Sequence, residues 1–483
     1  MNAPSSHPIL TCAAARRLEE QRFGGDEAQE WAAMQQAGCA VAAAAWRDFQ
    51  EIGGLPADGR VLVLAGKGHN GGDALIAAQA ILAGLPGVRV EVLFAFGSRT
   101  LRPLAARAWR ELVHAAGGRA KAVAEITGAY ALCLDGIFGF QFRPPAEPRI
   151  VALIDQANAA AIRMRVAVDL PSAGRFRADF TYATGSVKTP VIDAPEAGRV
   201  RYLDLGFFRG DEAGDERVLI PDLLAPLAQW RPSTTDKRSY GHVFVVGGSA
   251  HTPGAVLMTV LAALRSGAGL VTAFVPESLV PAYAARAPEA MWVGCPPTPE
   301  GGLALEGEHL LREKLDRATA LVVGPGLGRE PETLALARSI VESSKVPLVI
   351  DADALQADIV VAGEAPRIVT PHAGELERIG GRAMLRAGMT LVAKGPTTRI
   401  INGATVYHAL WGGPVLARAG SGDLLAGLIG GLLAQTPAEP LLAAARGVAW
   451  HGRAADALAR TLGQTAVSVT QLLEFLPTAL RER

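Results

Sequence analysis

The stretch Val61–Asp73, VLVLAGKGHNGGD, decides the fold of the first half of the chain. Val61–Ala65 is an apolar run of the length expected for a buried strand, and the glycines after it indicate a tight turn. The apolar residues after Asp73 predict a helix that begins there. A strand, a glycine-rich loop and a helix in this order are the building unit of a parallel α/β sheet.

The same alternation continues outward from this unit. One amphipathic helix is expected ahead of it, from about Cys12 to Phe49. The strands expected after it are apolar throughout rather than alternating, which is typical of a parallel sheet covered on both faces. These strands are Val88–Phe94, Tyr130–Asp135, Arg165–Leu170 and Arg201–Leu205.

A second α/β domain is expected after a break in this pattern. The charged stretch Arg209–Arg217, followed by several prolines, predicts a boundary between a domain at 1–215 and a domain at 220–483. An Asn-Gly turn between Thr398–Asn402 and Thr405–His408 predicts a hairpin. The other strands expected are His242–Val246, Leu270–Val275, Ala320–Val323, Pro347–Asp351, Arg367–Thr370 and Thr390–Lys394, and two helices, Asp423–Ala434 and Glu439–Leu462, close the chain.

The composition excludes several classes of protein. The 483 residues include 47 Lys+Arg and 47 Asp+Glu, and a net charge of zero lacks the basic surface of a general nucleic-acid binder. The longest apolar runs, such as Leu424–Ala434, are too short to span a bilayer. The start of the chain shows no secretory signal pattern, and the four scattered cysteines suggest no structural zinc site. We therefore expect a cytoplasmic protein with no nucleic-acid or membrane partner.

Polar residues follow several strands of the first domain. Gly66–Gly71 fits the G-x-G-x-x-G pattern of a dinucleotide-binding turn, although the glycines alone could serve only a tight turn. The Asp73 carboxylate would repel a phosphate, so together with Asn70 it favours sugar hydroxyls or a cation. Asp135 and Asp169 end two further strands, where each could cap a helix or form a turn. Together they indicate a ligand crevice at the carboxyl edge of the sheet.

The second domain repeats this arrangement. In Ala419–Asp423, AGSGD, a glycine-rich turn opens an apolar helix and suits a transferring phosphoryl group, with Asp423 as the proton acceptor. The alternative is that Asp423 only caps its helix. Gly324–Gly328, Asp351–Asp353 and Pro371–Glu375 follow other strands. The chain has no G-x-x-x-x-G-K-[ST], so nucleotide binding of the P-loop kind is excluded.

The first-domain motifs GKGHNGGD, DGIFGF and VDLPS resemble the YjeF-type epimerase domain of bifunctional NAD(P)H-hydrate repair enzymes. The resemblance implies a Rossmann-like three-layer α/β/α fold. It implies that Asn70, Asp135 and Ser172 hold K⁺ and that Asp169 is the acid/base at the nicotinamide ring. The substrate contacts it implies are His69, Asn70, Gly71, Gly72, Asp73, Gly139, Phe140, Gln141, Phe142, Arg143, Pro144, Pro145 and Asp169.

Three features depart from that family pattern. His69 stands where the family usually has an asparagine, and Ala173 stands where it usually has a glycine. The segment after Ser172 lacks the usual Asp-Thr-Gly, and Arg175–Phe180 runs directly onward. We expect this shortened loop to open or reshape one wall of the pocket.

The second-domain motifs resemble the ribokinase-like ADP- or ATP-dependent dehydratase domain of the same enzymes. They are GGSAHTPGAV, ALRSGAGLV, GPGLG, VIDADAL, VTPHAGELERI, LVAKGPTT and AGSGDLLAG, in the order of the family. The resemblance implies Asp423 as catalytic base and ADP or ATP carrying Mg²⁺. The substrate contacts it implies are Ala255, Gly326, His372 and Asp423, and the nucleotide contacts are Lys394, Gly395, Pro396, Thr397, Thr398 and Gly422.

The resemblance as a whole implies repair of hydrated NADH and NADPH. The apolar surfaces expected on two α/β domains favour a homo-oligomer. One domain would interconvert the epimers of the hydrate, and the other would phosphorylate the C6 hydroxyl and eliminate phosphate. Two alternatives remain open at this point. The first domain could be a non-catalytic binding module, or the second could be a small-molecule kinase that releases a phosphate ester.

Overall fold

The computed structural model describes residues 3–210 and 212–482 and divides them into two compact units. The N-terminal unit contains residues 7–210 and 212–214 together with residues 459–464, which lie late in the sequence. The C-terminal unit contains residues 215–458 and 465–482, together with residues 3–6. No helix in the described ranges is long and apolar enough to cross a membrane.

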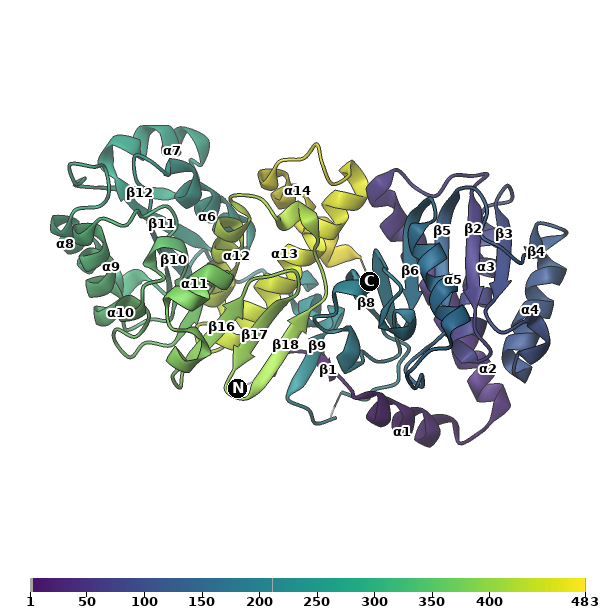
Figure 1. Cartoon of the computed structure of the whole chain (residues 1–483). Helices are drawn as coiled ribbons and strands as arrows, with labels where there is room; N and C mark the ends of the chain where they lie inside the picture. The colour runs from purple at the N-terminus through teal and green to yellow at the C-terminus, as the bar shows by residue number, and fades with distance from the viewer. Residues whose placement is uncertain (1–2, 211, 483) are drawn as a thin grey trace. The chain divides into compact units, whose positions relative to one another are not determined.

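The N-terminal unit is built on seven parallel strands in the order β4-β3-β2-β5-β6-β7-β8 (Figure 1). Val61 and Val63 of β2 face one hydrophobic core, and Leu62 and Leu64 face another, because successive strand residues point to opposite faces. The strands are β2 (Arg60–Ala65), β3 (Arg89–Phe94), β4 (Ala120–Ala122), β5 (Tyr130–Gly136), β6 (Ile162–Val168), β7 (Phe180–Thr184) and β8 (Arg199–Leu203).

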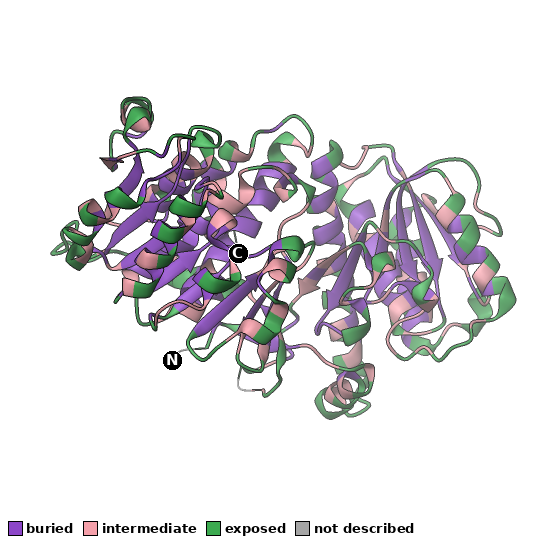
Figure 2. Cartoon of the chain, turned by 60° about the vertical axis from the view of Figure 1, so that its left-hand side comes forward, coloured by how far each residue is buried: buried purple, intermediate pink, exposed green. Residues whose placement is uncertain are grey.

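Helices cover both faces of this sheet, so the predicted three-layer fold is confirmed. The core behind Val61 and Val63 contains residues of α2 (Glu27–Phe49), α3 (His69–Gly84) and α4 (Pro103–Ala116). The core behind Leu62 and Leu64 contains residues of α5 (Pro148–Ala159). Figure 2 shows the strands of the sheet buried between these layers.

Two predicted helix boundaries in this unit were wrong. The expected helix over residues 12–49 is two helices, α1 (Cys12–Phe23) and α2. Gly24 and Gly25 have left-handed backbone between them, and Asp26 starts the second helix by accepting hydrogen bonds from the Ala28 and Gln29 amides. The helix expected from Asp73 begins at His69, which places the HNGGD motif in its first turns.

The C-terminal unit contains a larger mixed sheet in the order β1-β9-β18-β17-β16-β15-β14-β13-β10-β11-β12. The predicted hairpin is confirmed, because β17 and β18 are antiparallel neighbours. The strands are β1 (Ser6–Pro8), β9 (Glu216–Leu219), β10 (His242–Val246), β11 (Leu270–Pro276), β12 (Met291–Cys295), β13 (Ala320–Val323), β14 (Leu348–Ile350), β15 (Arg367–Val369), β16 (Met389–Ala393), β17 (Thr398–Asn402) and β18 (Thr405–Ala409).

Two helical layers enclose this sheet. On one face α12 (Ser421–Gln435) packs on α6 (Pro253–Arg265) and lies so close to the strands that a Cβ at Gly430 would come within 2.3 Å of Val322. On the other face the core contains residues of α8 (Glu308–Arg312), α9 (Pro331–Ser343) and α10 (Ala357–Val360). The remaining helices are α7 (Val280–Arg286), α11 (Ala373–Arg378), α13 (Pro440–Leu462) and α14 (Leu472–Arg481).

The prediction that two helices close the chain was wrong, because α14 follows them. Gly463 has left-handed backbone after α13, and the chain then turns into the short amphipathic helix. Five short strands were not predicted either: β1, β4, β7, β9 and β12. β7 matters most for function, because its carboxyl end carries a residue of the site described next.

Candidate active sites

The carboxyl edge of the N-terminal sheet opens into a cavity of about 900 Å³. Its walls come from the turns after β2, β5, β6 and β7 and from α1 and α2. Of the predicted substrate residues it is lined by His69, Asn70, Asp73, Gly139, Phe140, Gln141, Phe142, Arg143, Pro145 and Asp169. Gly71 and Gly72 are buried beneath it, where a Cβ would come within 2.4 Å of the Gly66 carbonyl and 2.5 Å of Met34 Sδ.

Asp169 is held in a constrained position at this edge. Its backbone is left-handed, with φ 66°, which is costly for a residue other than glycine and is typically retained at functional sites. Its carboxylate is buried and forms an ion pair with the buried ammonium of Lys188. Lys188 Nζ also donates to the Thr184 carbonyl at 2.9 Å. The structure therefore pairs the predicted acid/base with a lysine.

The sequence reasoning missed Lys188. Lys188 follows the end of β7, a strand that the sequence analysis did not predict. The signal that could have found it is the polar turn Thr184–Lys188 after the apolar residues of β7. Polar groups at such strand ends meet in one crevice.

Acidic groups outnumber cations around Lys188. Glu19 of α1 and Asp73 of α3 line the same cavity as Asp169. Burial raises the pKa of Glu19 to about 7, with Lys188 opposing the rise and Asp169 adding to it. Burial also raises the pKa of Asp73 well above its ordinary value. A cluster in which carboxyl groups hold protons near neutral pH can donate and accept protons at a bound ring.

The predicted K⁺ ligands come together behind the cavity. Asp135 is fully buried and accepts from Ser172 Oγ at 2.7 Å, from Ser172 N at 2.8 Å and from Ile137 N at 3.2 Å. The Phe138 backbone links Ser172 to Asn70. Its amide donates to Ser172 Oγ and its carbonyl accepts from Asn70 Nδ2, each at 2.9 Å.

The charge balance at Asp135 fits a monovalent cation. Burial raises the pKa of Asp135 to about 6 despite the hydrogen bonds to it. Among the residues that the structure describes, no arginine or lysine forms an ion pair with this carboxylate. A buried carboxylate without a cationic partner, beside the Ser172 hydroxyl oxygen, is a chemically suitable place for a hard cation of low charge.

The shortened loop after Ser172 lies outside the lining of the cavity. No residue from 170 to 183 is part of the cavity lining. The loop is held against its own domain, because Arg175 pairs with Asp155 of α5 and Phe176 is fully buried. Ala173 has φ 58°, a left-handed conformation that explains why a glycine suits this position.

The second candidate site lies where α12 begins. Gly420 is the N-cap with left-handed backbone, and its turn presents the first amides of the helix, where an anion would be stabilised. No side chain caps this helix, so Asp423 does not serve as its cap. Burial, with repulsion from Asp351, raises the pKa of Asp423 to about 6, while Lys394 opposes the rise.

Lys394 lies beside this turn, at the end of β16. Its Nζ donates to Asp351 Oδ1 at 2.9 Å and lies 3.7 Å from Glu375 Oε2. Burial alone would lower the pKa of Lys394, but the two carboxylates outweigh burial and raise it. Of the rest of the predicted nucleotide turn, Gly395 and Pro396 are exposed and Thr397 and Thr398 are half-buried.

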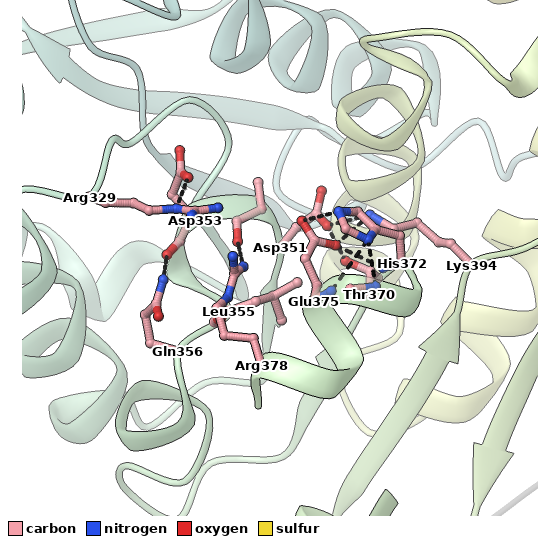
Figure 3. A network of polar contacts seen from close by, with 12 residues as sticks. Arg329, Asp351, Asp353, Leu355, Gln356, Thr370, His372, Glu375, Arg378 and Lys394 are labelled. Carbon is pink, nitrogen blue, oxygen red and sulfur yellow. Dashed lines mark hydrogen bonds and ion pairs between the residues drawn. The ribbon is translucent and has the colours of Figure 1, made fainter. Parts of the chain in front are cut away.

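The remaining predicted substrate residues lie in neighbouring strand-end turns. Gly326 is left-handed, and a Cβ there would come within 3.0 Å of Ala255 Cβ, so these two residues are adjacent. His372 is the N-cap of α11, and its Nδ1 accepts from the Gly374 and Glu375 amides. The rest of its ring is largely exposed. Figure 3 shows His372 and Glu375 close to Lys394.

Comparisons with known proteins match both units. Residues 31–194 match the family of the YjeF-related protein N-terminus, and residues 243–478 match the NAD(P)H-hydrate dehydratase family. The chain is 34% identical to the bifunctional NAD(P)H-hydrate repair enzyme Nnr of Moorella thermoacetica, over 93% of this chain and 92% of that protein. The Nnr enzyme of Gloeobacter violaceus is 36% identical, over 93% of each chain.

A solved structure resembles the second part of the chain. It is the ADP/ATP-dependent NAD(P)H-hydrate dehydratase of Bacillus subtilis co-crystallised with ATP/Mg²⁺. That protein is 25% identical to this chain, with a TM-score of 0.46, over 54% of this chain and 96% of its own.

Proposed function

The chain belongs to the family of bifunctional NAD(P)H-hydrate repair enzymes, and from this membership we propose how its two units divide the work. The N-terminal domain, residues 1–215, interconverts the C6 epimers of hydrated NADH and NADPH. The C-terminal domain, residues 220–483, dehydrates one epimer back to the coenzyme with ADP or ATP. The observation that carries the proposal is that each sheet has a buried acid at its carboxyl edge beside a lysine.

The dehydration proposed for the C-terminal unit proceeds in two steps. Hydroxide is a poor leaving group, so the C6 hydroxyl first attacks the terminal phosphorus of the nucleotide. The bridging P–O bond breaks, and the nucleotide leaves one phosphate shorter. Asp423 accepts the hydroxyl proton, and the Gly420–Gly422 amides stabilise the transferring phosphoryl group. The C6–O bond then breaks, phosphate leaves, and loss of the C5 proton restores the ring double bond.

Mg²⁺ would neutralise charge on the nucleotide phosphates. In the described part of the chain, no group of three or more histidine, cysteine, aspartate or glutamate side chains could hold a metal ion. This finding fits a Mg²⁺ ion that arrives on the nucleotide rather than one bound by a protein cluster. Lys394–Thr398 and Gly422 would hold the nucleotide, and Ala255, Gly326 and His372 would hold the hydrated ring.

The epimerisation proposed for the N-terminal unit needs a proton to enter and leave while the C6 centre is opened and reformed. Asp169 would move that proton, with the Lys188 ammonium stabilising its carboxylate form. K⁺ held by Asn70, Asp135 and Ser172 would supply a fixed positive charge behind the substrate loop. The raised pKa values of Glu19 and Asp73, which line the cavity with Asp169, favour this catalytic role over that of a binding module.

The test of the whole proposal uses the full chain and mixed epimers of hydrated NADH. Addition of ADP or ATP should restore the absorbance of the dihydronicotinamide, and inorganic phosphate should be released in equal amount. A stable phosphate ester in place of the coenzyme would identify a small-molecule kinase instead. No recovery with either nucleotide would overturn the dehydratase assignment.

We propose, finally, that the protein is a cytoplasmic homo-oligomer that takes neither nucleic acid nor a membrane as partner. The balanced charge supports the absence of a nucleic-acid partner. Light scattering after size exclusion should give a mass that is a multiple of 50.3 kDa. A mass of one chain at working concentration would contradict the oligomer.

The pKa of Asp423 predicts an acid limb in the dehydration rate. Asp423 can accept a proton only when ionised, and its pKa is raised to about 6. Activity should therefore fall as the pH drops through about 6, approaching tenfold per pH unit well below it. The measurement is kcat/KM for the hydrated coenzyme across this range. A limb near pH 4, typical of an exposed aspartate, would contradict the buried environment of Asp423.

Lys394→Ala should weaken nucleotide binding far more than dinucleotide binding. Loss of a charge-assisted contact predicts a Kd for the nucleotide about 10- to 100-fold higher, with that for hydrated NADH changed less than about threefold. Calorimetric titration of each ligand measures both, with the exposed Lys345→Ala as the matched control. Equal losses for the two ligands would show that the nucleotide site is wrongly assigned.

A further inference from the structure

The Lys394 ammonium is fixed by a network of carboxylates that are themselves fixed (Figure 3). Asp351, which is 1% exposed, accepts from Lys394 Nζ at 2.9 Å and from Thr370 Oγ1 at 2.7 Å, both through Oδ1. Glu375 lies on the other side of the ammonium and accepts from the His372 amide at 2.8 Å. A flexible lysine side chain is therefore held in one place by groups from two strand-end turns, those after β14 and β15.

The turn that opens α12 lies directly beside this ammonium. A Cβ built at Gly422 would come within 3.3 Å of Lys394 Nζ and within 4.0 Å of Asp351 Oδ2. The space at Gly422 is thus shared by the helix amides, the ammonium and the carboxylate. An ammonium has three N–H donors, and Asp351 takes one of them, so others can reach a phosphoryl group in this space.

We propose that Asp351 is a positioning residue for phosphoryl transfer, which holds the Lys394 ammonium against the Gly420–Gly422 turn where the transferred group lies. The proposal rests on the proposed dehydratase function and adds a residue to it. Asp351 touches neither the hydroxyl nor the phosphoryl group, and it acts through Lys394. A charge placed before the reaction stabilises the transition state without reorganisation, and small displacements of such a group are costly.

Asp351 and Lys394 shift the pKa of Asp423 in opposite directions. Burial and the Asp351 carboxylate raise its pKa, with smaller contributions from Asp353 and Glu375, and the Lys394 ammonium lowers it. His451 lies behind the turn and adds no charge near neutral pH, because burial lowers its pKa to about 4. Removal of either member of the Asp351–Lys394 pair should therefore move the titration of Asp423, and in opposite directions.

The first experiment is a double-mutant cycle on dehydration by the full chain at saturating nucleotide. Asp351→Asn and Lys394→Met should each lower kcat, by about 100-fold, since a misplaced ammonium is nearly as harmful as a missing one. The double variant should be no slower than Lys394→Met within about threefold. Multiplied losses, about 10,000-fold in the double variant, would overturn the proposal, because Asp351 would then act independently of Lys394.

The second experiment is the pH profile of the same variants. If Asp351 had a merely structural role, its replacement would not shift this profile. The acid limb of kcat/KM should shift to lower pH in Asp351→Asn and to higher pH in Lys394→Met. Unchanged limbs, or shifts in one common direction, would overturn the proposal. Asp358→Asn is the control, because Asp358 is an exposed α10 aspartate that pairs with Arg338 and should leave rate and limb unchanged.

Thr370→Val covers the case in which Asp351→Asn fails to fold. The valine keeps the shape of the side chain and removes the hydrogen bond that orients Asp351. We expect kcat about tenfold lower, and no further loss when the change is combined with Lys394→Met. A loss that persists in full beside Lys394→Met would contradict the proposal. Absence of dehydration in the unmodified chain would instead refute the proposed function itself.

Discussion

Asp423→Asn should lower nucleotide-dependent dehydration by about 100- to 10,000-fold while leaving the protein folded. The carboxylate is the only group at the α12 turn assigned to take the hydroxyl proton, and an amide of the same shape cannot take it. Asp423 makes no capping hydrogen bond to its helix, so the substitution removes no such bond. The measurement is recovery of the dihydronicotinamide absorbance from hydrated NADH with ADP or ATP.

Two controls accompany this variant. Its midpoint of thermal unfolding should lie close to that of the parent, because the change also removes a buried charge repelled by Asp351. Its Kd for the nucleotide should stay near the parent value. Near-normal turnover by Asp423→Asn would mean that another group accepts the proton, and the proposed mechanism would be wrong.

Asp169→Ala should eliminate K⁺-dependent epimerisation and leave dehydration untouched. Loss of a positioned acid/base predicts about a 100- to 10,000-fold slower reaction, and the Lys188 ammonium would lose its buried partner. The two activities are assigned to separate sheets, so dehydration provides an internal control. The assay follows conversion of the epimer that the dehydratase does not accept, with excess dehydratase supplied in trans.

Asp169→Asn is the matched variant for this prediction. The backbone at Asp169 is left-handed, a conformation that asparagine tolerates better than alanine, so the Asn variant tests the chemistry with less backbone strain. Both variants should be equally inactive as epimerases, whereas His69→Asn should retain activity, because either side chain can donate one hydrogen bond. If the parent chain gives no acceleration over the spontaneous rate in saturating K⁺, the N-terminal unit is a binding or structural module.

The sequence was sufficient for the fold class and for most of the strand ends that carry polar residues. Apolar runs such as Val61–Ala65 and His242–Val246 became central parallel strands, because a strand buried on both faces must be apolar throughout. It was less reliable for boundaries. The break at Gly24 and Gly25 and the early start of α3 at His69 depend on backbone conformations that an apolar pattern does not encode.

The sequence by itself determined which polar groups would share an edge of each sheet, because parallel strands all end on the same side. Asp135 and Asp169 share an edge of the first sheet, and Asp351, Lys394 and Asp423 share an edge of the second. Only the tertiary structure decided how these groups pair. Lys188 meets Asp169 across 19 residues of sequence, and Lys394 meets Asp351 across 43. The raised pKa of Asp423 was likewise invisible in the sequence, because burial and the charges of neighbouring turns set it, and both exist only once the chain has folded.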